Sequence, residues 1–147
     1  IAEEFIQGRE IECSVMGLNR EPQAATPGEL VVKHEFYSYE AKYLDENGAE
    51  IVIPAQLTEI ETEKIRSLAT RTYTALNCDG MARVDFFMRP DGSLIVNELN
   101  TLPGFTKISM YPMMWQARGL SYSDLITKLI DVAFKKFNMD SEIKLTF

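Results

Sequence analysis

Histidine and cysteine are scarce in this sequence, which contains one histidine and two cysteines among 147 residues. Cys13 and Cys78 are isolated, without the paired spacing of a zinc site or a dithiol redox motif. His34 has no partner motif, and such a histidine is more often a structural or surface residue than a ligand or a base. The sequence therefore offers no zinc centre and no disulfide framework, and we expect a reduced protein of the cytoplasm.

Basic side chains are also in the minority, with 15 lysines and arginines against 22 acidic residues and a net charge of -7. Lys135 and Lys136 form an isolated basic pair at the end of an expected helix. This charge balance disfavours nucleic acids and anionic membranes as partners, and no apolar run is long enough to span a bilayer. The first residue, Ile1, is not methionine and leads directly into strand-like sequence, so we expect a piece of a longer chain.

A hydrophobic content of 46% predicts one globular domain over residues 1–147. Alternating apolar and polar residues predict strands at 10–17, 29–33 and 50–53, and apolar residues at helical spacing predict helices at 59–76, 112–118 and 121–137. The last helix is expected to bury a broad stripe made of Leu125, Ile126, Leu129, Ile130, Ala133, Phe134 and Phe137. Residues 138–147 are expected to form a polar tail that ends in a short strand at 143–147.

Four acidic residues occupy the first strand and the segment before it. They are Glu3, Glu4, Glu10 and Glu12. The simplest interpretation is that all four face solvent, although an acid beside a turn can also bind the hydroxyls of a ribose.

Two apolar runs, 81–88 and 94–99, flank the turn sequence Arg-Pro-Asp-Gly and predict a β-hairpin. A two-residue connection through Pro90 and Asp91 would place Arg83 and Asp85 on one face with Glu98 and Asn100. The opposite face would then carry Val84, Phe86, Met88, Ile95 and Leu99. A three-residue turn with Gly92 as a bulge would scatter the acids over both faces. We favour the first register because it separates an apolar face from an acidic one.

Asp85, Glu98 and Asn100 then form an all-oxygen cluster, which suits Mg²⁺. Arg83 beside them could neutralise a phosphate or a developing oxyanion. The alternative is a structural ion pair between Arg83 and one of the two acids, and the spacing of the residues does not decide between these two interpretations.

Five motifs follow one another along the chain. They are Glu-Glu-Phe-Ile-Gln-Gly-Arg-Glu at 3–10, Phe-Tyr-Ser-Tyr-Glu-Ala-Lys-Tyr at 36–43, Ala-Arg-Val-Asp-Phe-Phe at 82–87, Asn-Glu-Leu-Asn-Thr-Leu-Pro-Gly-Phe-Thr at 97–106 and Ser-Met-Tyr-Pro at 109–112. Together they cover nearly the whole chain and closely resemble the D-alanine:D-alanine ligases of the ATP-grasp superfamily. The resemblance implies an α+β fold, the C-terminal half of an ATP-grasp domain, with an antiparallel sheet and helices on one side.

The resemblance also implies a reaction. ATP phosphorylates the carboxylate of one D-alanine, and the amine of a second attacks the acyl phosphate to give the dipeptide used in peptidoglycan. The expected ligands of two divalent ions, Mg²⁺ or Mn²⁺, are Asp85, Glu98 and Asn100. The expected catalytic residues are Arg83, the backbone N–H of Gly104, Lys42 and Tyr43.

Other residues match the binding positions of the family. The stretch Glu3, Glu4, Phe5 and Ile6 matches the lining of the adenine site, with Phe36 packing nearby, Glu10 matching the ribose-binding acid and Lys42 reaching the transferring phosphate. Ser109 and Met110 match the positions that take the carboxylate of the second D-alanine. Lys42 and Tyr43 in the lid loop favour D-alanine as the second substrate.

The resemblance places an N-terminal domain and a central ATP-binding subdomain before Ile1, so we expect residues 1–147 alone not to turn over. It also implies a homodimer for the whole enzyme. Two alternatives remain: another ATP-grasp carboxylate-amine ligase, such as a D-alanine:D-lactate ligase, or a nucleotide-binding module without chemistry. The concentration of polar residues around Arg83 argues against the second.

Overall fold

The structure is a computed structural model that describes residues 2–32 and 49–141. Its elements are β1 (Arg9–Gly17), β2 (Gln23–Ala24), β3 (Gly28–Val32), β4 (Ala49–Val52), α2 (Glu59–Ala75), β5 (Gly80–Met88), β6 (Leu94–Asn100), α3 (Met110–Ala117) and α4 (Tyr122–Ser141). The sequence predicted these elements, except that it missed β2 and ended α4 four residues too early. The strand predicted at 143–147 lies outside the described residues.

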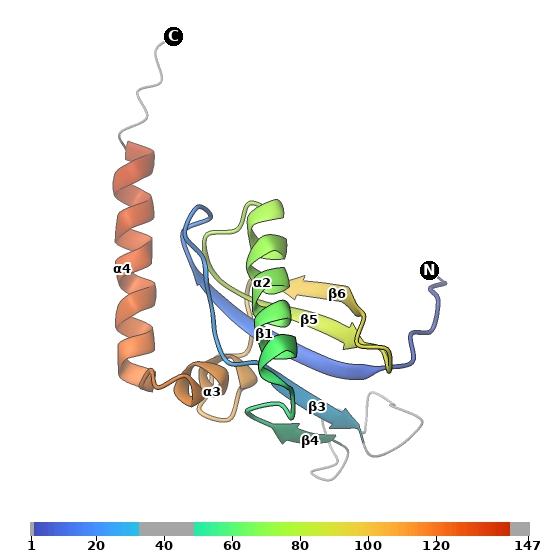
Figure 1. Cartoon of the computed structure of the whole chain (residues 1–147). Coiled ribbons are helices and arrows are strands. Elements are labelled where there is room, and N and C mark those ends of the chain that lie inside the picture. The colour runs from blue at the N-terminus through green and yellow to red at the C-terminus, as the bar shows by residue number, and fades with distance from the viewer. Residues whose placement is uncertain (1, 33–48, 142–147) are drawn as a thin grey trace.

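The strands form one antiparallel sheet in the order β4-β3-β1-β5-β6, with β2 paired to the end of β1 (Figure 1). β1 and β5 lie at its centre and pair along their whole length, from Arg9 opposite Met88 to Gly17 opposite Gly80. Every residue of β1 from Ile11 onward is buried. A charged side chain on β1 or β5 is therefore surrounded by neighbouring strands on both sides.

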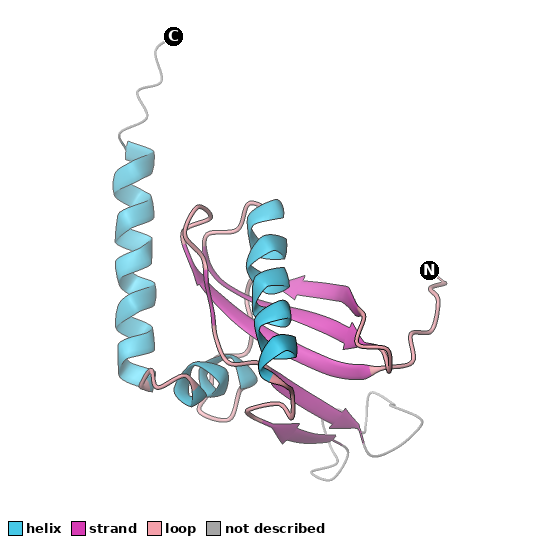
Figure 2. Ribbon diagram, viewed as in Figure 1, coloured by secondary structure: helices cyan, strands magenta, loops and turns pink. Residues whose placement is uncertain are grey.

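Figure 2 shows α2 lying across one face of this sheet. The core residues show that α3 packs against the other face, so the prediction of helices on one side is wrong. Ile11, Cys13 and Val15 of β1 pack with Ile65, Ala69 and Tyr73 of α2 in one hydrophobic core. The intervening residues face the other way: Ser14 donates a hydrogen bond to the Tyr111 carbonyl at 3.2 Å, and Met16 packs with Trp115. The apolar residues of α3 pack in this second core, because α2 already covers the other face of the sheet.

The start of α2 is a capping box formed by Thr58 and Glu61. The Thr58 hydroxyl accepts a hydrogen bond from the Glu61 N–H at 3.2 Å, and the Glu61 carboxylate accepts one from the Thr58 N–H at 2.8 Å. This capping box satisfies two backbone donors that the first turn leaves free. Among the described helices, none is long and apolar enough to cross a membrane.

The hairpin has a different turn from the one predicted. The Arg89 N–H donates to the Ser93 carbonyl and the Gly92 N–H donates to the Arg89 carbonyl, both at 2.9 Å, and Gly92 has a φ of 77°. The connection is therefore the three-residue turn, in which glycine takes the left-handed position.

A β-bulge further along the hairpin restores the predicted arrangement of the acids. Near the turn, Met88 pairs with Leu94 and Phe86 with Val96, whereas Asp85 pairs with Glu98, so that Asn97 is the extra residue. An extra residue reverses the side-chain parity of everything beyond it. Asp85 and Glu98 consequently share a face, as predicted, while Ile95 lies opposite Phe87 on that same face and not on the apolar one.

The expected broad buried stripe of α4 is wrong. Leu125 is fully buried and Leu129 packs beside it, but Ile126, Ile130, Phe134 and Phe137 are between 39% and 69% exposed. The helix stands at the end of the sheet in Figure 1. Its packed side is the one that carries Leu125 and Leu129, and Lys136 lies 3.6 Å from Asp79, the residue before β5. Helical periodicity marks apolar positions, but it does not show which of two adjacent stripes contacts the sheet.

We predict that truncation of the two stripes affects stability differently. Leu125→Ala should lower the free energy of unfolding of the chain by about 2–4 kcal/mol, because it leaves a cavity in the second core. Phe134→Ala should lower it by less than about 1 kcal/mol, because most of that ring is already in water. Urea unfolding followed by circular dichroism measures both. Equal losses would show that α4 packs on the sheet through both stripes.

Candidate active site

Three carboxylates form a row across adjacent strands on the face that α2 does not cover. Glu12 of β1 is the cross-strand partner of Asp85 of β5, and Asp85 is the partner of Glu98 of β6. Directly paired residues of an antiparallel sheet lie on the same face, with their Cβ atoms about 4.5–5.5 Å apart. The hairpin therefore brings Asp85 and Glu98 together, and β1 adds a third acid.

Arg83 lies in the next row, between Ser14 and Asn100. Its Nε donates to Asp85 Oδ1 at 2.8 Å and its Nη2 donates to Asp85 Oδ2 at 2.7 Å. Glu98 Oε1 lies 4.0 Å from Nη2. The ion pair that the sequence left open is thus formed, in the two-pronged geometry that gives arginine–carboxylate pairs their strength.

Glu12 faces this cluster and not solvent, so its interpretation as a solvent-facing charge is wrong. The residue is only 8% exposed, and its Oε2 lies 3.0 Å from Arg83 Nε but receives no hydrogen bond. The reason is stoichiometric: Nε carries one hydrogen, and Asp85 accepts it. Glu29, a buried carboxylate on the other face, differs because it accepts two hydrogen bonds from Arg9, at 2.7 and 2.6 Å.

The pKa of Glu12 reflects this environment. The pKa is raised from 4.5 to about 7, because burial and the negative charge of Asp85 raise it more than the positive charge of Arg83 lowers it. For Arg83, burial lowers the pKa, but the hydrogen bond to Asp85 and the surrounding carboxylates outweigh burial and raise it overall. The guanidinium is therefore always charged, whereas Glu12 titrates near neutral pH.

The cluster lines a hollow of about 240 Å³ that also includes Glu10 and Asn97. Glu10 shares the face of Glu12 two residues earlier, opposite Phe87. The predicted ribose-binding acid thus lies on the same side of the sheet as the predicted metal ligands. Its contact with a ribose stays a prediction.

The oxygen donors are of the kind that a hard divalent cation binds. Asp85 offers a carboxylate whose side chain is 14% exposed, and Glu98 one that is 60% exposed. Asn100 Oδ1 accepts a hydrogen bond from the Leu102 N–H at 2.9 Å, which leaves one lone pair for a cation. Within the described residues, no three His, Cys, Asp or Glu side chains converge as a metal site. One or two carboxylates, an amide oxygen and substrate phosphates are the set that Mg²⁺ takes.

The remaining predicted residues fall into two groups. Glu3, Glu4, Phe5 and Ile6 form an irregular segment before β1, where Phe5 is 88% exposed and Glu4 lies 3.7 Å from Arg89 at the hairpin turn. Phe36, Lys42 and Tyr43, like His34, lie outside the described residues. The nucleotide contacts predicted for both groups stay predictions.

The loop after β6 carries the other expected substrate contacts. Ser109 Oγ accepts a hydrogen bond from the Thr106 N–H at 3.0 Å, and a Cβ on Gly104 would lie 3.1 Å from that oxygen. Met110 is buried in the second core, so its backbone N–H at the start of α3, and not its side chain, remains for a carboxylate. Phe105 anchors the loop, with its ring centroid 5.7 Å from that of Tyr111.

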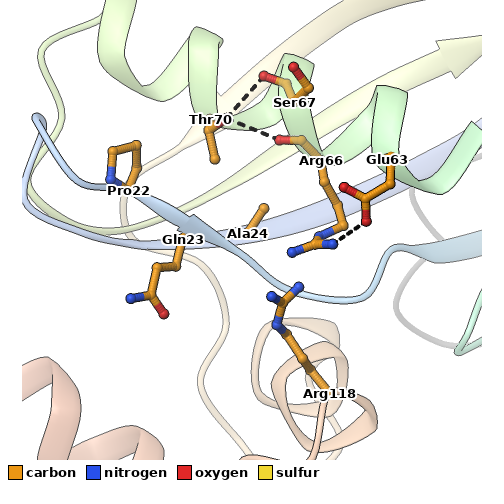
Figure 3. A pocket seen from close by; sticks show the side chains of 8 residues that line it. All are labelled: Pro22, Gln23, Ala24, Glu63, Arg66, Ser67, Thr70 and Arg118. Atoms are coloured by element: carbon orange, nitrogen blue, oxygen red, sulfur yellow. Dashed lines mark hydrogen bonds and ion pairs between the residues drawn. The ribbon is translucent and has the colours of Figure 1, made fainter.

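A second hollow, between β2 and α2, has the opposite chemistry (Figure 3). Its charged side chains are Arg66, Arg118 and Glu63, and Arg66 is paired with Glu63. Burial and the neighbouring charge of Arg66 lower the pKa of Arg118. Two arginines and one paired acid cannot hold a divalent cation, so we assign the candidate site to the carboxylate row.

Solved structures share this fold over most of the chain. A D-alanine-D-alanine ligase from Coxiella burnetii superposes with a TM-score of 0.82 at 40% identity, covering 96% of this chain and 36% of that one. A ligase from Bacillus anthracis complexed with ATP gives 0.75 at 31% identity, covering 94% of this chain and 43% of the other. The VanG D-Ala:D-Ser ligase of Enterococcus faecalis superposes with a TM-score of 0.78 at 37% identity, covering 88% of this chain and 37% of that one. The sheet and helices therefore define the C-terminal half of an ATP-grasp domain, as predicted.

Sequence relatives identify the family within this class. Residues 1–131 match the family described as D-ala D-ala ligase C-terminus. The D-alanine–D-alanine ligases A of Escherichia coli (strain K12) and Salmonella typhimurium are 52% and 51% identical over 146 residues, which are 99% of this chain and 40% of either relative. The chain belongs to the D-alanine–D-alanine ligase family, and it spans 40% of the length of these relatives.

We predict that Glu12 makes stability depend on pH in the metal-free chain. Its pKa of about 7 in the folded state lies above the ordinary value of 4.5, so the folded state binds more protons between these values. The free energy of unfolding should therefore fall by about 2–3 kcal/mol between about pH 5 and pH 8, as the buried carboxyl ionises.

Glu12→Gln should abolish most of this fall, whereas Glu21→Gln, the same charge change at an exposed position, should leave it unchanged. Urea unfolding at several pH values measures the effect. A Glu12→Gln variant with the wild-type pH profile would contradict the prediction.

Proposed function

We propose that the protein to which this chain belongs joins two D-alanines into D-alanyl-D-alanine with ATP, for peptidoglycan precursors. The observation that carries the proposal is the pairing of Asp85 with Glu98 beside Arg83, in a chain of the D-alanine–D-alanine ligase family. In the proposed reaction, ATP phosphorylates the carboxylate of the first D-alanine. The amine of the second then displaces phosphate from the acyl phosphate.

Two divalent ions, Mg²⁺ or Mn²⁺, held by Asp85, Glu98 and Asn100, would offset the negative charge of the crowded phosphates. Glu98 is suited to bridge because its side chain is the most exposed of the carboxylate row. Arg83 would stabilise negative charge that develops on the transferring phosphoryl and at the attacked carbonyl. The backbone N–H groups of Gly104 and Met110 are proposed donors to the oxyanion and to the substrate carboxylate.

A related ligase with another second substrate is the alternative function. The VanG structure shows that this fold occurs in a D-Ala:D-Ser ligase. We favour D-alanine because the relatives at 51–52% identity are D-alanine–D-alanine ligases. Identification of the products formed with D-alanine alone, and with added D-serine or D-lactate, separates the alternatives. The homodimer, the further domains and the cytoplasmic location stay predictions.

A chimera tests the proposed function. In the Escherichia coli ligase A, the segment that matches this chain is replaced by residues 1–147. With ATP, Mg²⁺ and D-alanine, the chimera should release phosphate and form D-alanyl-D-alanine, whereas residues 1–147 alone should release none. Turnover by the short chain would contradict our expectation that further domains are needed. A folded but inactive chimera would contradict the proposed function.

Within the chimera, Glu98→Ala is the sharpest variant, because the exposed side chain can be removed with little effect on folding. We expect activity to fall at least about 100-fold and stability to change by less than about 0.5 kcal/mol. Glu59→Ala, an exposed acid on α2, is the matched control and should retain full activity. Unfolding of the Glu98 variant would support a purely structural role for the carboxylate cluster.

A further inference from the structure

Arg83 has two carboxylates within reach of one hydrogen. Its Nε lies 2.8 Å from Asp85 Oδ1 and 3.0 Å from Glu12 Oε2, and the hydrogen goes to Asp85. Glu12 therefore occupies an acceptor position next to the guanidinium without a hydrogen bond. The competition follows from the sheet register, which makes Glu12 and Asp85 direct partners and places Arg83 one row away on the same face.

Leaving Glu12 in this position is costly. A buried acceptor without a hydrogen bond is destabilising, and a buried carboxylate without a full partner more so. Glu12 is 8% exposed and stands next to a second negative charge, Asp85. An apolar side chain would remove this cost, so we look for a use of the carboxylate in another state of the site.

That state arises when Asp85 binds a cation. A carboxylate that coordinates a metal no longer offers both oxygens to a guanidinium, and Arg83, with a side chain only 20% exposed, would lose two hydrogen bonds in a partly dry site. Glu98 is a poor substitute, because its nearest oxygen is 4.0 Å away and its side chain is 60% exposed. Glu12 is already in contact.

We propose that Glu12 is the second acceptor for Arg83: when a divalent cation engages Asp85, the guanidinium turns its Nε–H to Glu12 and stays in the site. The inference rests on the proposed function, because it takes Asp85 as a metal ligand. Glu12 acts through Arg83 and is thus a positioning residue. Glu12 thereby keeps the guanidinium in the same place in the cation-free and the cation-bound state. Only the acceptor of the Nε–H differs between the two states.

Two substitutions of Glu12 separate an acceptor from a mere charge. Glu12→Gln and Glu12→Met both remove the negative charge at similar size, but only glutamine keeps a carbonyl oxygen that accepts a hydrogen bond. If Glu12 acts as an acceptor, the glutamine variant is intermediate between wild type and methionine. If it acts by charge alone, the two variants are equal. Glu21→Gln is the control for the charge change at an exposed position.

The direct readout is the Arg83 Nε–H signal in nitrogen-15 NMR spectra of the 147-residue chain, at a pH where the carboxylates are ionised. Arg83→Lys identifies the signal by its loss. Titration with Mg²⁺ alone should shift this signal in wild type while its exchange with water stays slow. In Glu12→Met, Mg²⁺ should speed the exchange at least about tenfold, with Glu12→Gln in between. An Nε–H equally protected in Glu12→Met would overturn the inference.

Mg²⁺ affinity, measured by calorimetry on the same chains, gives a second test. Glu12→Met should weaken binding about tenfold and Glu12→Gln about threefold, because freeing Asp85 now leaves Arg83 without a charged acceptor. In the Arg83→Gln background, the glutamine and methionine variants should bind Mg²⁺ equally. A difference between them that persists without Arg83 would overturn the inference, since Glu12 would then act without the guanidinium.

The experiment also distinguishes this inference from the proposed function. If Mg²⁺ shifts the Arg83 signal, and neither its affinity nor the Nε–H exchange depends on the residue at position 12, the role of Glu12 is wrong and the metal site stands. If Mg²⁺ leaves the Arg83 signal of the wild-type chain unchanged, Asp85 is not a metal ligand, and the proposed function fails together with the inference.

Discussion

One guanidinium lies among three carboxylates on the face of the sheet that α2 does not cover, and the arrangement of the site depends on how its hydrogen bonds are shared among them. Arg83 gives two hydrogen bonds to Asp85, approaches Glu12 at 3.0 Å and lies 4.0 Å from Glu98. Three acids and one base leave a net negative charge in a partly buried place, which is unfavourable for the protein alone and favourable for a cation. The stability of the metal-free chain and the proposed binding of a cation thus depend on the same four side chains.

The sheet enforces this crowding through pairing and parity. β1, β5 and β6 are adjacent and antiparallel, so residues at matched positions on three strands share one face. The bulge at Asn97 is essential: without it, the three-residue turn would turn Glu98 away from Asp85. α2 seals the opposite face, while α3 and the loop anchored by Phe105 border the second core on the side of the acids. The rigid elements therefore fix the backbone positions from which the four charged side chains meet.

The sequence predicted most of this architecture, and its failures have physical causes. Strands and helices followed from periodicity, and the shared face of Asp85 and Glu98 was predicted correctly. The turn type was predicted wrongly. The three-residue turn and the β-bulge each shift the side-chain parity by one residue, so their effects cancel. The simpler two-residue turn therefore places the acids on the same face. Glu12 was missed because alternation shows that a residue points away from the core, but not whether strands on both sides bury it. On α4, two apolar stripes adjoin, and only the tertiary contacts decide that Leu125 is buried while Phe134 is exposed.

The most direct test of the account is a crystal structure of the chimera with Mg²⁺ and a non-hydrolysable ATP analogue. We predict an ion that touches carboxylate oxygens of both Asp85 and Glu98, with the double hydrogen bond from Arg83 to Asp85 broken. An ion bound elsewhere, with that double hydrogen bond intact, would contradict it and leave the carboxylate row as a structural cluster.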